Sequence, residues 1–171
     1  MTTLQIIVMA GAYAAALVAT SYFTRAPSRR VMGALAGGAA AGGLGLGAMV
    51  LGEVLGVWRV FIPSTPGVRV IFYLGFAISC SPVYLITWRV ARRFGWRGLA
   101  VCLIVVGVIG PPRDYLFAAV HPEWMVFAPG IVPILADAAT YVGIVALGHA
   151  VMRFVSGPAR ESRLARQSSA A

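Results

Sequence analysis

Charged residues are scarce in this chain, and almost all of the charge has one sign. Only 11% of the 171 residues are charged, whereas a typical soluble domain carries roughly 25%. The chain has no lysine and only five acidic residues, so its fourteen arginines leave a formal net charge of +9. This shortage excludes the polar surface of an ordinary soluble domain and favours a protein that lies in lipid.

Cysteine and histidine are also rare, with two of each. Cys80 and Cys102 lie in apolar segments without a CxxC, haem or zinc pattern. We expect them to be small buried hydrophobic side chains, and the sequence leaves a disulfide between them open. The chain also lacks the H-E-x-x-H pattern of a zinc site and the G-x-S-x-G pattern of a serine nucleophile. We therefore expect no metal ion and no cofactor.

Hydrophobic residues make up 60% of the chain and gather in continuous runs. Such runs of about 18–25 residues predict membrane-spanning helices, and their lack of alternation argues against a β-barrel. Four of the runs cover residues 4–23, 32–54, 70–88 and 129–153. The remaining run, the fourth in the chain, starts near residue 98 and reaches the prolines at 111–112, and its continuation to residue 120 is left open. The sequence therefore predicts an all-α polytopic integral membrane helix bundle with five transmembrane helices, forming one domain over residues 1–155. Residues 156–171 are expected to form a basic, disordered cytoplasmic tail.

The arginines indicate the orientation of the predicted bundle, because cytoplasmic loops carry an excess of basic residues. Eleven arginines fall on one side, in the loops after the first and third spans and in the tail: Arg25, Arg29, Arg30, Arg89, Arg92, Arg93, Arg97, Arg153, Arg160, Arg163 and Arg166. The other side holds Arg59, Arg69 and Arg113. We predict an outside N-terminus and a cytoplasmic C-terminus in the inner or plasma membrane. The same rule accounts for the basic charge, so we expect no nucleic-acid partner.

The aromatic residues agree in part with these boundaries. Tryptophan is enriched at the two membrane–water interfaces, where its ring lies at the level of the headgroups. Trp58 is near the outer end of the second span, and Trp88 and Trp96 flank an inner loop. Trp124 precedes the last span. We predict that all four are interfacial anchors.

The second span is unusually rich in glycine. It contains three G-x-x-x-G pairs: Gly33 with Gly37, Gly38 with Gly42, and Gly43 with Gly47. Glycines four residues apart lie on nearly the same face of a helix and let a second helix approach closely. Because the pairs are offset around the helix, we predict a central helix that packs on several neighbours within the chain. A homodimer interface is the alternative.

The scarce polar residues concentrate in residues 110–130, GPPRDYLFAAVHPEWMVFAPG. We expect Pro111 and Pro112 to bend or end the fourth span, because proline lacks a backbone donor and clashes with the preceding turn. Arg113, Asp114, His121 and Glu123 would then lie near the outer membrane surface, in the same layer as Glu53. His121 and Glu123 are two residues apart, which is not a ligand spacing on a helix.

Asp137 differs from this group because it lies inside the predicted last span. An aspartate in the middle of a bilayer costs at least about 2.5–3.5 kcal/mol and is a functional candidate by default. Tyr141 is four residues on and shares its helix face. Three arrangements stay open: a structural Arg113–Asp137 or Arg113–Asp114 bridge, an open acidic pocket for proton chemistry, or a neutral Asp137 that hydrogen-bonds to neighbouring helices.

These features support three hypotheses of function. The first is a structural or accessory membrane protein that packs on itself or on a membrane partner through the glycine-rich span. The second is an enzyme acting on a lipid or isoprenoid from the outer side, with Asp137 and Asp114 as acid–base groups. Its binding residues would be Arg113, Tyr141, His121, Glu123 and Glu53. The third is a proton-coupled transporter using Asp137, although the sequence shows no inverted repeat.

Overall fold

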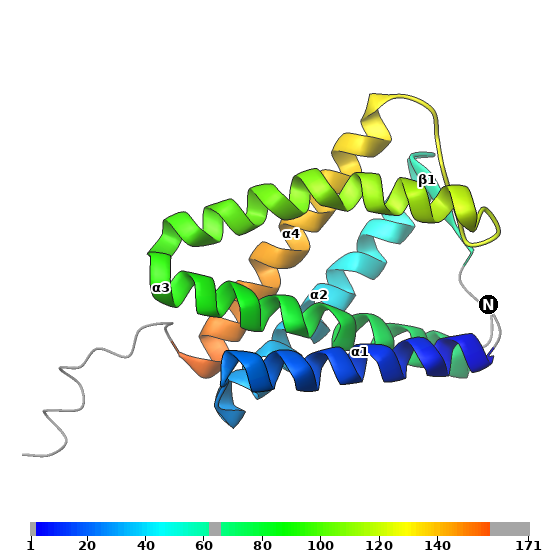
Figure 1. The fold of residues 1–171 in the computed structure, drawn as a ribbon. Coiled ribbons are helices and arrows are strands. Elements are labelled where there is room, and N and C mark those ends of the chain that lie inside the picture. The colour runs from blue at the N-terminus through cyan, green and yellow to red at the C-terminus, as the bar shows by residue number, and fades with distance from the viewer. Residues whose placement is uncertain (1–2, 62–65, 158–171) are drawn as a thin grey trace, which may run out of the picture.

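The computed structural model describes residues 3–61 and 66–157 as helices joined by short connections and one small β-ribbon. The elements are α1 (Thr3–Thr24), α2 (Ser28–Val54), β1 (Trp58–Val60), α3 (Pro66–Val120), β2 (Met125–Phe127) and α4 (Ile131–Ser156) (Figure 1). The four helices are each long and apolar enough to cross a membrane. The fold is thus all-helical in its main body, and the composition of its helices is that of a membrane protein. The predicted tail falls mostly outside the described residues.

The longest helix, α3, turns back on itself at Gly95. Its dihedral angles, φ 68° and ψ −152°, are not helical, and side chains other than glycine rarely adopt this positive φ. Figure 1 shows α3 as two limbs that both extend from this turn toward the same end of the molecule, so that the chain direction reverses between them. We name residues 66–94 the first limb and residues 96–120 the second limb. They contain the segments predicted at 70–88 and from 98 onward.

The second limb continues through the two prolines at which we expected it to bend or end. Pro111 and Pro112 both lie inside α3, which continues to Val120, and Gly95 is the position where helical dihedrals are lost. The expectation of a helix end was therefore wrong. Proline is tolerated in membrane helices because neighbouring helices and local adjustments satisfy the freed backbone groups.

The helix ends gather at two opposite ends of the bundle (Figure 1). The α1–α2 connection, the Gly95 turn and the last turn of α4 form one end, which we name the turn end. There, Arg30 of α2 donates to Ser156 Oγ of α4 over 3.0 Å, and its guanidinium lies 5.4 Å from the Trp88 ring centroid. The opposite end carries β1 and β2 and is named the ribbon end. Each long segment connects the two ends.

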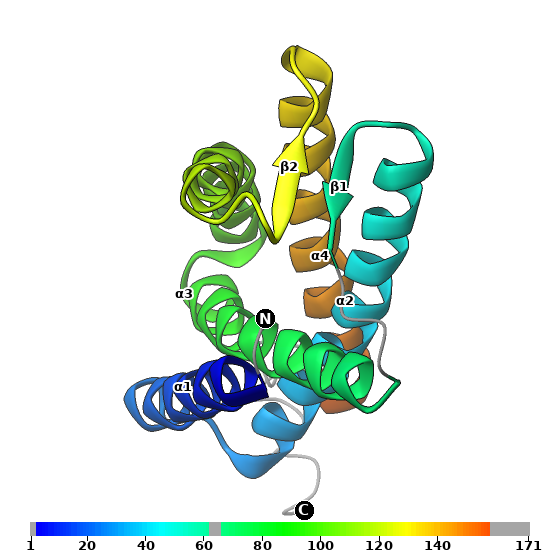
Figure 2. The ribbon, with the colours of Figure 1, turned by 90° about the vertical axis from the view of Figure 1, so that its right-hand side faces the viewer.

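The helix α2 lies against both α3 and α4 (Figure 2). Four of the six glycines in its G-x-x-x-G pairs make room for these neighbours. A Cβ atom at Gly33 would meet Ser156, one at Gly37 would meet Gly148 and Tyr84, one at Gly38 would meet Ala77 and Ser81, and one at Gly42 would meet Tyr73. A Cβ at Gly43 or Gly47 would meet nothing within 4 Å. Most of the glycine surface is therefore used for packing within the chain, and one narrow face is left over.

Two of the four tryptophans are packed inside the bundle and not at its edge. Trp58 is buried, its ring contacts Gly52, and its Nε1 donates to the Met49 carbonyl over 3.3 Å. Trp88 is buried in the core, whereas Trp96 is 76% exposed. The anchor prediction is therefore wrong for Trp58 and Trp88. Glycine on α2 leaves a space that the Trp58 ring fills, which sequence position alone does not show.

The β-ribbon joins the connection between α2 and α3 to the connection between α3 and α4. β1 pairs antiparallel with β2, with Trp58 opposite Phe127, Arg59 opposite Val126 and Val60 opposite Met125. Phe127 also packs edge-on against the Trp58 ring, with centroids 6.1 Å apart. The ribbon therefore ties the end of α2 to the approach to α4, next to the residues described below.

Candidate functional site

Polar side chains from α3 and α4 meet near the ribbon end. Tyr141 Oη donates to the Asp114 carboxylate, with its two oxygens 2.9 and 3.0 Å away. Arg113 Nε donates to Asp114 Oδ1 over 3.1 Å. The Arg113 guanidinium carbon also lies 5.8 Å from the Tyr141 ring centroid. The carboxylate of Asp114 is therefore held by a phenol and a guanidinium from two sides, and this contact joins the two helices.

Glycine on the second limb of α3 permits this contact. A Cβ atom at Gly110 would overlap the Tyr141 ring, and one at Gly107 would lie 3.0 Å from Val142 Cγ2. Gly107 and Gly110 are three residues apart and so lie on neighbouring parts of one helix face. The approach of α4 to this face carries the Tyr141 hydroxyl to Asp114.

The buried acid of the site is Asp137, which is only 5% exposed. Its Oδ2 has no hydrogen-bond partner among the described residues. It lies within electrostatic range of Asp114 and Arg113, yet no ion pair joins Arg113 to Asp137 in the described part of the chain. Of the two bridges predicted as alternatives, the structure contains the Arg113–Asp114 pair.

Asp137 lies closer to the start of its helix than the middle of the span, where the sequence indicated it. α4 begins at Ile131, so Asp137 is about 9 Å along the helix at 1.5 Å per residue. This places the carboxyl toward the ribbon end of α4 and not at its middle.

A second unpartnered group lies on the facing helix. Tyr115 Oη is buried and has no hydrogen-bond partner among the described residues. The Tyr115 ring stacks on Phe127 of β2, with centroids 4.1 Å apart and planes 12° apart. Tyr115 and Asp137 are close enough to interact electrostatically. Tyr115 could not be assigned a role from the sequence, because nothing in the sequence shows that β2 covers its ring.

His121 and Glu123 form a separate pair in the connection after α3. His121 Nδ1 lies 3.3 Å from Glu123 Oε1, and the His121 ring packs near Phe117 and Trp124. The pKa of Glu123 is lowered, first by its own backbone N–H and then by His121. Glu53 is exposed at the end of α2. None of these three side chains has a recorded contact with Asp114 or Asp137 in the described part of the chain, so the predicted binding set is only partly brought together.

A further polar cluster, which sequence analysis missed, is buried at the turn end. Arg30 donates to Ser156 Oγ and to the Gly157 carbonyl oxygen, and His149 Nδ1 lies 2.9 Å from Thr87 Oγ1. Arg30 was counted among loop arginines, but it begins α2 and is buried against α4. These contacts join α2, α3 and α4. His149 Nε2 is nevertheless buried without a hydrogen-bond partner among the described residues, as is the nearby Trp88 Nε1. His149 lies here, twelve residues beyond Asp137 on α4.

The described residues contain no group of three His, Cys, Asp or Glu side chains placed to hold a metal ion. Cys80 and Cys102 are free thiols. The chain matches no family model, no curated protein and no solved structure.

Proposed function

We propose that this chain is an integral membrane enzyme that carries out acid–base chemistry on a lipid or isoprenoid at the ribbon end of the bundle. The observation that carries the proposal is the buried Asp137 carboxyl, whose Oδ2 lacks a hydrogen-bond partner among the described residues. A buried polar atom without a partner is costly, and ionisable groups within membrane spans mark functional sites. On the facing helix, Tyr115 Oη is also buried without a hydrogen-bond partner among the described residues. A polar group of a substrate would supply the missing partners.

The contacts of the two aspartates favour a positioning role for Asp114 and an acid–base role for Asp137. Asp114 accepts from Tyr141 and Arg113, so its carboxylate is already occupied and acts as a positioning group. Asp137 has an oxygen available to take up or release a proton, which is the requirement for a general acid or base. The side chain of Arg113 is 71% exposed. It can therefore hold an anionic group of the substrate while remaining paired with Asp114.

The surroundings of the site favour a substrate with a long apolar part. The helices that carry the polar residues expose large apolar side chains on their outer faces, among them Leu116 and Val120 on α3 and Val132 and Leu135 on α4. In a membrane, an acyl or prenyl chain would lie along these faces. Its polar end would then reach the level of Asp137 and Arg113.

We further propose that the chain crosses the membrane five times, with the N-terminus outside, the C-terminus in the cytoplasm and the ribbon end facing outward. Residues 96–120 alone extend about 37 Å at 1.5 Å per residue, which exceeds a hydrocarbon core of about 30 Å. The distribution of eleven arginines against three in the sequence supports this orientation in the plasma or inner membrane.

The test compares lipid and pigment extracts from wild-type cells, a deletion strain, and strains carrying Asp137→Asn, Asp114→Asn or Glu123→Gln at the native locus. We expect the Asp137→Asn strain to accumulate the same precursor as the deletion strain, because asparagine cannot exchange the proton. The Asp114→Asn strain should accumulate less of it, since a neutral amide still accepts from Tyr141. Glu123→Gln is the matched control, because it removes an exposed carboxylate outside the site.

Protein levels in the membrane are measured for each variant, so that loss of folding is separated from loss of chemistry. If deletion changes the extract but Asp137→Asn leaves the wild-type profile intact, Asp137 is not the acid–base residue and the proposal fails. If the deletion itself changes neither lipids nor pigments, the enzyme proposal as a whole is refuted.

A second candidate function, an accessory subunit in a homo-oligomer or with another membrane protein, is favoured by one observation. Gly43 and Gly47 form a G-x-x-x-G pair that meets no other part of the described chain within 4 Å. Such a pair lets another membrane helix approach closely. Replacing both with isoleucine would block that approach. Crosslinking in membranes before and after the change tests this role, and an unchanged crosslinking pattern would count against it.

A further inference from the structure

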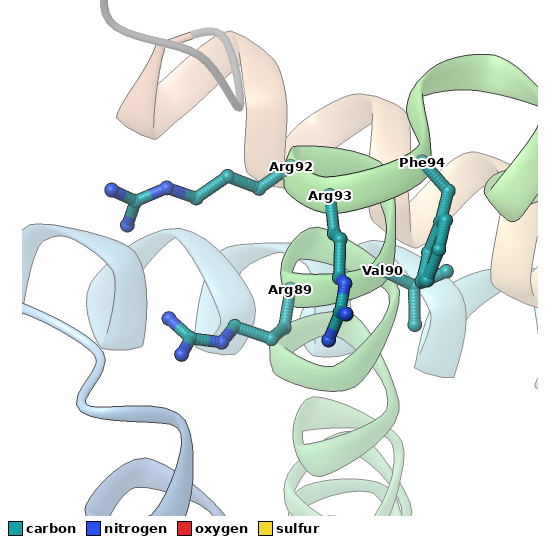
Figure 3. Close-up of a pocket in the computed structure, with 5 residues that line it drawn as sticks. All are labelled: Arg89, Val90, Arg92, Arg93 and Phe94. Carbon is teal, nitrogen blue, oxygen red and sulfur yellow. The ribbon is translucent and has the colours of Figure 1, made fainter.

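A hollow opens beside the last turns of the first limb of α3, at the turn end. It is lined by Arg89, Val90, Arg92, Arg93 and Phe94 (Figure 3). The three arginines are at i, i+3 and i+4, a spacing that places side chains on one helix face. In Figure 3, Arg89 and Arg92 extend in the same direction, and Arg93 and Phe94 point along the helix beside Val90.

Neither Arg89 nor Arg93 forms an ion pair with another residue in the described part of the chain. The carboxylates of the described chain, Glu53, Asp114, Glu123 and Asp137, belong to α2, the second limb, the ribbon connection and the early part of α4, all toward the ribbon end. Two of the arginines also lie over aromatic rings. The Arg92 guanidinium lies 5.8 Å from the Trp88 ring, and that of Arg93 lies 5.3 Å from the Phe94 ring.

The hollow combines this charge with apolar surface. Val90 and Phe94 form part of its lining, and Phe94 and Trp96 are exposed large side chains on either side of the Gly95 turn. Guanidinium groups bind phosphate through paired N–H donors in a planar fork. A molecule with a phosphate group and a hydrocarbon chain would fit both the arginines and the apolar surface of the hollow. Basic groups at the end of a membrane helix also lie at the level of lipid headgroups.

We propose that this hollow is a binding site for the phosphate headgroup of an anionic phospholipid, with Arg89 and Arg93 as its main ligands and Phe94 against the lipid chain. The inference is independent of the enzyme proposed above, because it concerns the opposite end of the bundle. The general excess of basic residues sets the orientation of a membrane protein without a specific site. The proposed site is instead saturable, and binding depends on these arginines more than on others at the same end.

The test is native mass spectrometry of the full-length protein, delipidated in detergent and then titrated with phosphatidylglycerol or phosphatidylcholine of identical acyl chains. We expect the wild type to bind one phosphatidylglycerol in preference to phosphatidylcholine. The double variant Arg89→Gln/Arg93→Gln should lose at least about tenfold in affinity for phosphatidylglycerol, the size expected for lost charge-assisted hydrogen bonds. The control Arg97→Gln/Arg153→Gln removes the same charge from the same end and should change affinity by less than about twofold.

If the Arg89→Gln/Arg93→Gln variant is unstable, the variant Arg89→Lys/Arg93→Lys provides the test, because it keeps both positive charges. It should still lose affinity, because an ammonium group cannot make the paired contact. Equal losses in the hollow and control variants would show diffuse attraction and overturn the proposal. Equal binding of phosphatidylcholine would overturn it as well. Full displacement of the lipid by millimolar inorganic phosphate would assign the site to free phosphate and not to a lipid.

Discussion

The packing of α2 can be tested by adding a single methyl group to glycines on its different faces. At Gly37 and Gly38 a Cβ atom would overlap the backbone carbonyl groups of Gly148 and Ala77. Backbone atoms cannot rotate away as a flexible side chain can, so the helices must separate. Gly43→Ala and Gly47→Ala are the matched controls, because a Cβ there meets nothing within 4 Å.

The magnitude follows from two opposing terms. Replacing glycine with alanine inside a helix stabilises it by about 1 kcal/mol at any of these positions. Overpacking costs about 1–3 kcal/mol where the methyl group has no space. Of the four positions compared, this applies to Gly37 and Gly38 and not to Gly43 and Gly47. We therefore expect each packed variant to be less stable than each control by about 1–3 kcal/mol. The controls should equal or exceed the wild type in stability.

The assay is unfolding of the monomeric fraction in mixed detergent micelles by increasing sodium dodecyl sulfate. Tryptophan fluorescence reports the transition, since Trp58 and Trp88 are buried in the folded bundle. Loss of stability in Gly43→Ala equal to that in Gly37→Ala would refute the assignment of faces. It would mean that the Gly43 face is packed against something, and the arrangement of α2 described here would be wrong.

Three further predictions concern single residues. Tyr141→Phe removes the hydroxyl that donates to Asp114 and should lower the free energy of unfolding by about 1.5–3 kcal/mol. The same detergent titration measures this loss. An unchanged midpoint would show that the hydrogen bond does not contribute to stability. Gly95→Ala places a side chain at a φ of 68° and should cost about 1–3 kcal/mol, seen as faster proteolysis near the turn, whereas wild-type protection would contradict the strain. His121→Ala should raise the pKa of Glu123 only part of the way to its ordinary value, because the backbone N–H lowers it most and His121 less. Because the pKa of Glu123 is lowered in the folded protein, its contribution to stability is complete above the ordinary pKa and is lost as pH falls through the lowered value. NMR titration of the Glu123 carboxyl tests this, and an unchanged pKa in the variant would exclude the pairing with His121.

The sequence identified the residues of the candidate site but not which of them contact one another. Arg113, Asp114, Asp137 and Tyr141 could be selected because polar residues are costly in apolar segments and so attract attention wherever they occur. Which of them pair depends on the approach of α4 to the second limb, and Gly107 and Gly110 control that approach. Their effect is not visible in a pattern of charge or hydropathy.

Composition and hydropathy by themselves determined that this chain is an all-helical protein with helices apolar enough for a membrane, because burial in lipid requires long uncharged runs whatever the packing. Only the tertiary structure decided that α3 turns at Gly95 and continues through Pro111 and Pro112. It also decided that Arg113 pairs with Asp114 while Asp137 is left with an unpartnered oxygen. The physical reason is range: hydropathy sums over neighbours in sequence, whereas a hydrogen bond depends on the position of one atom on another helix.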